Sequence, residues 1–364
     1  MQTCQLPTSP WILQVQAITM GVFISAILLL PGISLGHEAA ERYHQAQSAA
    51  KAQQWPQAED FLKQALQHFP NYAEAHHLLG LIQFEVTHDP ASAIPSLQQA
   101  ITLAPHLVQA QYDLALMYLR QQKMEEAQPL LKKALEEYPT FWKAALALAQ
   151  TFEQQGQIPQ ALEQYDSVLI QAPDQPEALY AVSYLNFKDG QWEEAHQSLT
   201  RLVKAHTQHS EGWLLLGRVE EMRNQPTQAI QAYETAVTLQ PASPQAHHSL
   251  AFLYQQQGEV SKAIEHFEAV TQRKPNDFEA FMNLGVLLST VNDTAKAKEA
   301  YLHALAINKA SPELQYNLGN FFEFHEVDLD RAKQHYRRYI ELGGTDPRVQ
   351  RLLEQLGPDL QPEN

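Results

Sequence analysis

The residues whose types and spacing could do chemistry form an aromatic face with a cation at its edge. Tyr180, Tyr184 and Phe187 follow one another at intervals of four and three residues, and Lys188 comes next. These intervals place the three rings on one side of a helix. The segment also holds apolar residues for packing, such as Leu179, so the aromatic face is surplus to the core. This pattern predicts binding of a partner, because aromatic side chains are frequent hot spots of interfaces.

No catalytic motif accompanies this face. The sequence contains no glycine-rich phosphate loop, no H-E-x-x-H, no C-x-x-C and no G-x-S-x-G. The 16 histidines include two adjacent pairs, His76 with His77 and His247 with His248. Neighbouring residues of a helix point about 100° apart, so neither pair chelates a metal ion by itself. We expect solvated or groove-lining histidines, no metal, no cofactor and no enzymatic activity.

The charge balance disfavours polyanionic partners. The chain carries 25 Lys and Arg against 41 Asp and Glu, a formal net charge of -16. Such a surface repels the phosphates of nucleic acids and anionic lipid headgroups. A single cysteine, Cys4, allows neither a disulfide framework nor a thiolate metal site. The sequence therefore predicts a protein partner, no nucleic acid, and a fold stabilised by packing alone.

The N-terminal segment is apolar and uncharged. Residues 1–36 contain no Asp, Glu, Lys or Arg, and the most apolar run extends from Ala17 to Leu30. Small residues up to Gly36 resemble a signal-peptidase site, whereas the uncharged run from Ile12 is long enough to span a bilayer. We therefore weigh a cleaved signal peptide against a retained membrane anchor, with a buried helix as a third alternative. The first two predict a periplasmic or secreted protein that contacts the membrane only through residues 11–35.

A 34-residue period runs through the rest of the chain. Proline recurs at steps of 34, 35 or 68 residues: Pro70, Pro105, Pro139, Pro173, Pro241 and Pro275. Alanine stands twelve residues before each: Ala58, Ala93, Ala127, Ala161, Ala229 and Ala263. Four residues after each alanine comes a large side chain: Leu62, Leu97, Leu131, Tyr165, Tyr233 and Phe267. A small residue with a large one at i+4 predicts a closely packed helix that the proline ends.

A first helix precedes this one in each period. Trp213, Leu216, Gly217 and Glu220 occupy the slots of the pattern W-x2-L-G-x2-Y, which resembles a tetratricopeptide repeat. Nine units follow this frame, beginning near Ala39, Ala73, Val108, Trp142, Pro176, Ser210, Pro244, Phe278 and Pro312. The resemblance implies an all-α fold, a right-handed superhelical solenoid of about nine helix-turn-helix repeats with a C-terminal capping helix.

The same frame predicts the turns and the domain limits. Gly or Asn stands at one turn position of five repeats, where a helix commonly ends in left-handed backbone: Gly156, Gly190, Asn224, Gly258 and Asn292. We expect the repeat array over residues 37–346, a capping helix over 347–357 because its apolar residues form one stripe, and a disordered tail over 358–364.

The resemblance also implies a concave groove lined by the first helix of each repeat. The positions that line such grooves carry His77, Phe84, Tyr112, Leu116, Arg120, Tyr180, Tyr184, Phe187, Lys188, Arg218, His248, Phe252 and Tyr316. Each of these residues could instead belong to the core stripe. Asn283 and Asn317 match an asparagine that grips peptide backbone in the similar arm of O-linked N-acetylglucosamine transferases. The ordered Lys and Asn of a two-carboxylate clamp are not found.

Three functional hypotheses remain open from the sequence. The leading one is a non-enzymatic interaction scaffold of the bacterial cell envelope, which binds an extended or helical segment of another protein in the groove. The second is an envelope assembly or export accessory whose aromatic rings stack on carbohydrate or peptidoglycan. The third is the regulatory arm of a separately encoded enzyme.

Overall fold

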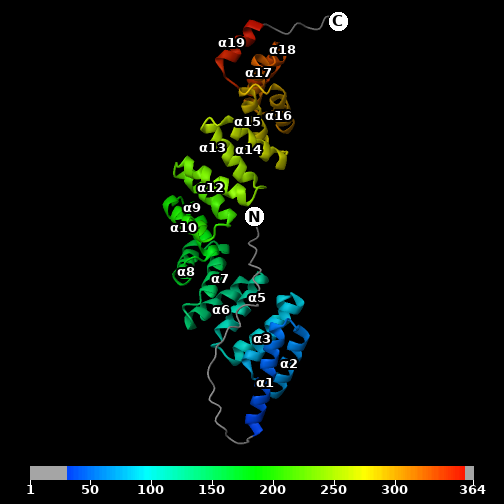
Figure 1. The fold of residues 1–364 in the computed structure, drawn as a ribbon, viewed down its shortest axis with the longest axis vertical. Helices are drawn as coiled ribbons and strands as arrows, with labels where there is room; N and C mark the ends of the chain where they lie inside the picture. Colours follow the sequence, from blue (N-terminus) through cyan, green and yellow to red (C-terminus); the bar gives the residue numbers. More distant parts are fainter. Residues whose placement is uncertain (1–30, 357–364) are drawn as a thin grey trace. The chain divides into compact units, whose positions relative to one another are not determined.

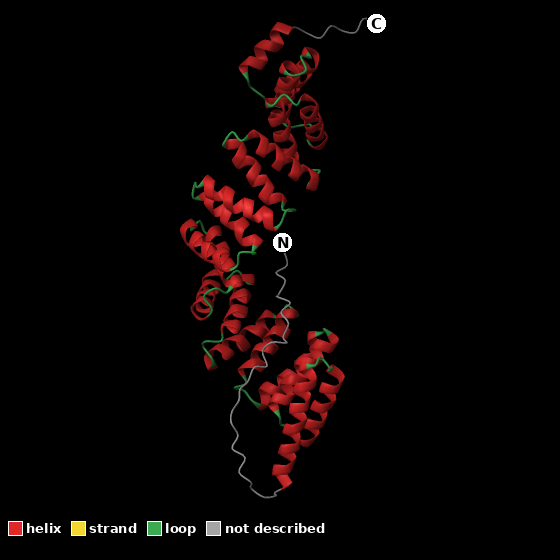
Figure 2. Ribbon diagram, in the orientation of Figure 1, coloured by secondary structure: helices red, strands yellow, loops and turns green. Residues whose placement is uncertain are grey.

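The computed structural model describes residues 31–356, and all of their regular structure is helical (Figure 2). Short loops join the helices, and no strand occurs in this part of the chain. The all-α class predicted from the period is confirmed. Most of the proposed signal or anchor, and all of the tail predicted over residues 358–364, lie outside the described residues. Among the helices that are described, none combines the length and the apolar composition needed to cross a membrane.

The chain divides into two compact units, residues 1–178 and residues 179–364, and the boundary lies within α9 (Figure 1). Consecutive helices pair into hairpins in both units, and neighbouring hairpins stack on each other. The N-terminal unit contains α1 (Pro31–Lys51), α2 (Trp55–His68), α3 (Ala73–Thr87), α4 (Pro90–Leu103), α5 (Val108–Arg120), α6 (Met124–Glu137), α7 (Trp142–Gln154) and α8 (Ile158–Gln171).

The C-terminal unit continues from α9 with five hairpin-forming pairs and one further helix. Its helices are α9 (Pro176–Lys188), α10 (Trp192–Ala205), α11 (Ser210–Met222), α12 (Pro226–Leu239), α13 (Pro244–Gln256), α14 (Val260–Arg273), α15 (Phe278–Thr290), α16 (Thr294–Ile307), α17 (Pro312–Phe324), α18 (Leu329–Glu341) and α19 (Pro347–Leu356). Eight of the nine first helices begin at the predicted residue. The exception is α1, which extends from Pro31, the first described residue, instead of beginning near Ala39.

Each hairpin is closed by a large side chain of its second helix, the knob, which lies over a small residue of its first helix. A Cβ atom added to Gly217 would lie 2.6 Å from the ring of Tyr233. One added to Gly285 would lie 2.7 Å from the ring of Tyr301. The same contact joins Gly80 with Leu97 and Gly319 with Tyr336. The alanine four residues before each knob is fully buried, as at Ala229, which confirms the close packing predicted from the period.

Three of the four tyrosine knobs donate their hydroxyl group to a glutamate at the end of the first helix. Tyr165 donates to Glu153 over 2.6 Å, and Tyr233 donates to Glu221 at the same position of its own repeat. Tyr336 donates to Glu323 over 2.5 Å. The fourth tyrosine knob, Tyr301, has Ser289 at the equivalent position and forms a hydrogen bond with it, so each of these buried hydroxyl groups has a partner.

The turn inside each hairpin passes through left-handed backbone. The φ angle lies between 57° and 78° at all five predicted positions, Gly156, Gly190, Asn224, Gly258 and Asn292. The other four repeats place Gln53, His88, Gln122 and Val327 there, with φ between 54° and 61°. The sequence carried no signal for these four residues. Hydrogen bonds of the following N–H close these turns: it reaches back five residues from Gln54 and Lys123, six from Asp328, and after His88 it binds the Thr87 hydroxyl over 3.1 Å.

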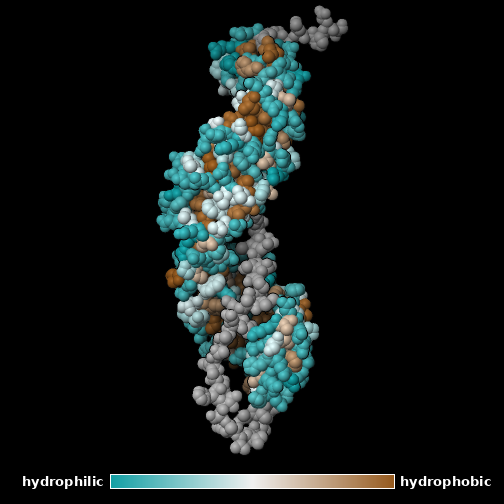
Figure 3. All heavy atoms as spheres, viewed as in Figure 1, coloured by the Kyte–Doolittle hydropathy of each residue, from teal (hydrophilic) through white to brown (hydrophobic). Residues whose placement is uncertain are grey.

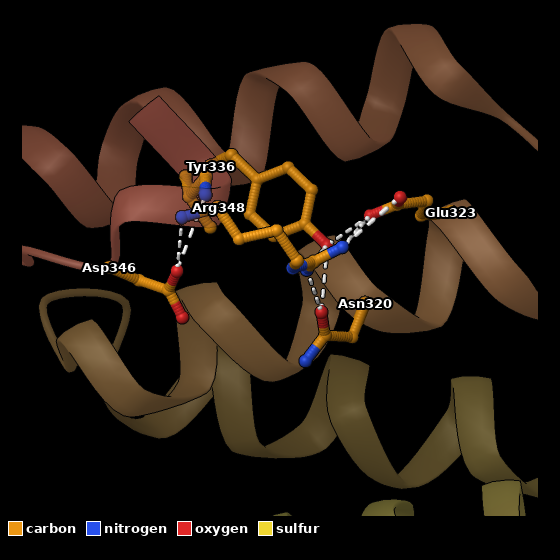
Figure 4. A network of polar contacts seen from close by, with 6 residues as sticks. Asn320, Glu323, Tyr336, Asp346 and Arg348 are labelled. Atoms are coloured by element: carbon orange, nitrogen blue, oxygen red, sulfur yellow. Dashed lines mark hydrogen bonds and ion pairs between the residues drawn. The ribbon is translucent and has the colours of Figure 1, made fainter. Parts of the chain in front are cut away.

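The last helix is attached through a network centred on one arginine (Figure 4). The guanidinium of Arg348 donates to Asn320 Oδ1 over 2.6 Å, to the Tyr336 hydroxyl over 2.8 Å and to the Glu323 carboxylate over 3.0 Å. Asp346 accepts the backbone N–H of Arg348 over 2.7 Å and so begins α19. Arg348 thereby ties α19 to both helices of the preceding hairpin, α17 and α18.

The outer surface is largely hydrophilic on the face shown in Figure 3, and hydrophobic residues form separate patches on it. Most apolar side chains lie between the helices instead, including tyrosines as large as Tyr165 and Tyr233. A stack of hairpins has only nearest-neighbour contacts, so damage at one hairpin should stay local.

The contact between Gly217 and Tyr233 predicts the effect of adding one methyl group. Gly217→Ala should overpack the hairpin by about 1 to 3 kcal/mol, which exceeds the gain of about 1 kcal/mol from removing a helical glycine. We expect a lower urea midpoint, followed by circular dichroism, and faster hydrogen exchange in α11 and α12. Gln231→Ala, at an exposed position of α12 in the same hairpin, is the control and should leave the midpoint nearly unchanged. A rise in midpoint for both variants would contradict the packing account.

Candidate functional site

Five of the predicted groove residues meet on one surface of the C-terminal unit, which we call the α9–α11 surface: Tyr180, Tyr184, Phe187, Lys188 and Arg218. Tyr180 and Tyr184 are stacked with their ring centroids 6.4 Å apart. The Lys188 ammonium lies 5.2 Å from the centre of the Tyr184 ring. The Arg218 guanidinium, from α11, lies 4.6 Å from the centre of the Phe187 ring. Each cation therefore covers a ring of α9.

The helix α9 separates this surface from its packing side. Leu179, Val182 and Leu185 are buried, and Ser183 donates to the carbonyl of Leu179 over 2.6 Å within the helix. The three aromatic rings on the other side remain half-buried, and Lys188 is exposed. Leu179 and Val182 are buried, as expected for the packing stripe, and the aromatic stripe on the other side is partly exposed.

The two cations of the α9–α11 surface are not neutralised by a neighbouring acid. Among the residues that the structure describes, neither Lys188 nor Arg218 forms an ion pair within 4.0 Å. His209, the residue before α11, stacks on Tyr180 with ring centroids 5.5 Å apart. Burial, with Glu211 nearby, raises the pKa of Tyr180, so its hydroxyl stays protonated and neutral. The surface thus combines ring faces with unpaired positive charge in a strongly acidic chain.

His209 is a member of this surface that sequence reasoning missed. It lies outside the first helix, and its ring also accepts the backbone N–H of Gly212 over 2.9 Å, which caps α11. Histidine is not among the residues preferred at a helix N-cap, so no local pattern marked His209. Trp192, the first residue of α10, completes the surface by packing on Phe187 with ring centroids 5.4 Å apart.

The predicted groove residues of the N-terminal unit fall into separate contacts. The guanidinium of Arg120 lies 4.9 Å from the centre of the Phe84 ring, a pairing like that of the α9–α11 surface. Tyr112 packs on Phe141, and Leu116 packs against the local core. His77 forms a hydrogen bond with Asp113, whose fully buried carboxylate lies 2.6 Å from the Nε2 atom of His77.

The remaining predicted residues of the C-terminal unit are also occupied by local contacts. His248 packs on Phe252, with ring centroids 4.8 Å apart. Tyr316 packs on Tyr339 over 5.3 Å. Asn283 donates to the carbonyl of Glu279 within its own helix over 3.0 Å, which uses one of its donors. Asn317 is half-buried.

Two histidines of the adjacent pairs, His76 and His247, form hydrogen bonds to the turn between repeats. His76 Nε2 lies 2.9 Å from the carbonyl of Pro70, and His247 Nε2 lies 3.1 Å from the carbonyl of Pro241. A carbonyl only accepts, so Nε2 carries the proton in both. Other repeats make this bond, six residues back, with Gln111, Trp213 and Gln315. Within residues 31–356, no group of three or more His, Cys, Asp or Glu residues could hold a metal ion.

Comparison with known families agrees with this architecture. Models described as tetratricopeptide repeat match residues 42–72, 87–141, 118–185, 186–246, 221–284 and 278–311. The chain is a tetratricopeptide repeat protein. Membership of this family, together with the hairpin stack, supports a protein-interaction scaffold.

Individual relatives of this tetratricopeptide repeat protein are distant. Protein CTR9 homolog of Arabidopsis thaliana is 26% identical over 68% of this chain and 24% of its own length. Cellulose synthase operon protein C of Xanthomonas axonopodis pv. citri (strain 306) is 26% identical over 75% of this chain and 22% of its own length. Protein O-mannosyl-transferase TMTC1 of Homo sapiens is 26% identical over 45% of this chain and 19% of its own length. The chain spans about a quarter or less of these curated relatives.

Solved structures are similar in fold. PilF of Pseudomonas aeruginosa is 24% identical, with a TM-score of 0.47 over 57% of this chain and 95% of that chain. PilW, a type IV pilus biogenesis factor, is 19% identical, with a TM-score of 0.48 over 58% of this chain and 98% of that chain.

One histidine of the tetratricopeptide array predicts a pH dependence of stability. Burial, with His247 Nδ1 2.9 Å from its own Nδ1, holds the pKa of His266 below its usual value of 6.5. The folded chain then binds fewer protons than the unfolded chain, so His266 destabilises the fold as the pH falls below about 6.5. Tyr254, stacked on His266, and the nearby Glu234 and Glu265 belong to the same environment.

We therefore expect the urea midpoint of the C-terminal unit to fall between pH 7.5 and pH 5.5, by a smaller amount in His266→Gln than in the wild type. Hydrogen exchange in α13 and α14 measures the local part of this change. His303→Gln, at an exposed histidine, is the control and should keep the wild-type dependence. Equal dependences in the wild type and in His266→Gln would refute the assignment.

Proposed function

We propose that this protein is a non-enzymatic interaction scaffold of the bacterial cell envelope, and that it binds an extended or helical segment of a partner protein in a concave groove. The observation that carries this proposal is the α9–α11 surface. Its rings and cations lie on the side of α9 that the packing of the helix leaves open. Partner segments bind such surfaces through a few buried anchors surrounded by weaker contacts.

The composition of the surface favours a protein segment as the ligand. Tyr180, Tyr184 and Phe187 supply ring faces, and Lys188 and Arg218 supply charges that no acid of the described chain neutralises within 4.0 Å. Aromatic residues and arginine are enriched at protein interfaces. A partner residue that displaces water from these rings gains both apolar contact and attraction to the cations.

The envelope location rests on the N-terminal sequence. Residues 1–36 carry no charged side chain, and the apolar run from Ala17 to Leu30 is typical of a signal peptide or of an anchor. Either form would deliver the repeat array to the periplasmic side, with the groove near the membrane if the segment is retained.

The groove assignment predicts which surface touches the partner. A photo-crosslinking amino acid in place of Tyr184 should form a discrete adduct in intact cells, identified by mass spectrometry. The same amino acid in place of Gln197, an exposed residue of α10 in the same hairpin, is the control. We expect an adduct from position 184 that position 197 does not form. Identical adducts from both positions would contradict the groove.

The double variant Tyr184→Ala and Phe187→Ala should weaken capture of the crosslinked partner by about 30-fold or more, since truncating a hot spot removes about 2 kcal/mol. Because Leu179 and Val182 supply the packing of this helix, we expect helicity and the melting transition to stay close to wild type. A large loss of thermal stability with capture retained would show that the rings belong to the core.

The compartment can be tested with alkaline phosphatase, which folds only where disulfides form. A fusion after residue 60 should be active, and mass spectrometry of the purified protein should distinguish a chain that begins at His37 from one that retains Met1. An inactive fusion on an uncut chain would place the array in the cytoplasm.

A further inference from the structure

Three aromatic rings meet where the first repeat of the N-terminal unit is followed by the second. The turn between α2 and α3 reads FPNY at residues 69–72 and supplies two of the rings, while α1 supplies the third, Tyr43. The ring centroid of Tyr72 lies 5.0 Å from that of Tyr43 and 6.0 Å from that of Phe69. Phe69 is 46% exposed, whereas Tyr43 and Tyr72 are half-buried. We call these three residues the first ring cluster, and its Phe69 side is open to solvent.

An unpaired acid lies beside this cluster. Glu74, in the first turn of α3, is exposed, and within the described chain it forms no ion pair within 4.0 Å. Burial, with Tyr43 and Glu74 nearby, raises the pKa of Tyr72 to about 12. Burial also raises the pKa of Tyr43, and Glu74 adds to this rise. Both hydroxyl groups therefore stay neutral, and Glu74 supplies an unpaired negative charge close to the two rings.

The protein's own cations do not occupy this cluster. Several Lys and Arg side chains lie over aromatic rings in residues 31–356, but none of them lies over a ring of the first cluster. Arg42, which precedes Tyr43, donates to Gln45 over 2.9 Å. His68, which precedes the turn, lies 3.3 Å from the carboxylate of Glu38. The exposed ring and the unpaired acid thus form a site with the charge and the surface that suit a cation from outside.

The same unit contains a second ring cluster, two repeats further on, with the opposite charge beside it. Tyr112, Tyr138 and Phe141 occupy the equivalent positions, and the turn reads YPTF at residues 138–141. The ring centroid of Phe141 lies 5.0 Å from that of Tyr112 and 6.2 Å from that of Tyr138, which nearly repeats the distances of the first cluster. Lys143 stands at the position of Glu74. The chain therefore contains two similar clusters that differ in the sign of one charge.

We propose that the first ring cluster, together with Glu74, binds an arginine side chain of a partner protein. A planar guanidinium stacks on a ring face and donates two parallel hydrogen bonds to a carboxylate, whereas the ammonium of lysine does neither. The second cluster carries the cation Lys143 at this position and repels a further cation. The site lies in the N-terminal unit, apart from the residues of the α9–α11 surface, and does not depend on that surface binding a partner.

Peptide titration of the full-length chain, followed by fluorine NMR, tests this site. 3-Fluorotyrosine in place of Tyr72 reports on the first cluster, and 4-fluorophenylalanine in place of Phe141 reports on the second. The probe is the peptide acetyl-Gly-Ser-Arg-Ser-Gly-amide, and its control carries citrulline, which has nearly the same shape and no charge. We expect a saturable shift at position 72 with a dissociation constant of about 1 to 10 mM, because one stacked cation and one exposed ion pair supply the binding. The citrulline peptide should bind about fivefold more weakly or worse, and position 141 should not respond.

Substitutions at Glu74 separate the charge from the rings. Glu74→Gln should weaken binding of the arginine peptide by about threefold or more, since it removes the ion pair and keeps the size of the side chain. Glu74→Lys copies the second cluster and should abolish the response at position 72. Glu177→Lys, at the equivalent exposed position of α9, is the control and should leave the response intact. Unchanged circular dichroism in each variant shows that the fold is retained.

Four outcomes would each overturn the proposal. They are a shift at position 72 that does not saturate, equal binding of the arginine and citrulline peptides, an equal response at position 141, and a response that survives Glu74→Lys. Choline chloride is a further probe, because a quaternary ammonium also binds ring faces. Tighter binding of choline than of the arginine peptide would assign the cluster to a quaternary ammonium ligand and so contradict the arginine assignment.

Discussion

The structure depends on one contact, the large side chain of each second helix lying over a small residue of the first. A Cβ atom added to Gly217 would lie only 2.6 Å from the ring of Tyr233, so the ring occupies the space that a side chain would take. This close approach fixes the spacing of the two helices and leaves each hairpin with a defined inner side. Stacking of further hairpins then follows from the same 34-residue period.

The knob contact also determines which side chains stay free for other roles. A first helix needs only its buried stripe for the hairpin and its neighbours, as Leu179 and Val182 show in α9. Rings on the opposite stripe, such as Tyr184 and Phe187, are then restrained by cations instead of by the core. A second helix also has an exposed outer side, as at Gln197 of α10.

The acidic composition has a different role at each of these surfaces. Most acids serve local structure, as Glu323 does in the network around Arg348 and Asp113 does beside His77. In a chain with a net charge of -16, cations that lie over an aromatic ring instead of beside an acid are distinctive. Lys188 and Arg218 are two such cations, and both lie on the α9–α11 surface.

The sequence by itself determined the all-α class, the period and the starts of eight first helices, because these follow from local propensities and from spacing along the chain. It also determined that Tyr180, Tyr184 and Phe187 share one face of a helix. It could not place Arg218 over Phe187 or His209 against Tyr180, since these contacts join residues about one repeat apart. The left-handed backbone at Gln53 and Val327 could not be predicted either, because neither position has a glycine or an asparagine. Hydrogen bonds of the folded turn stabilise it instead. Only tertiary structure decides such features, since they depend on distances between helices that no local pattern encodes.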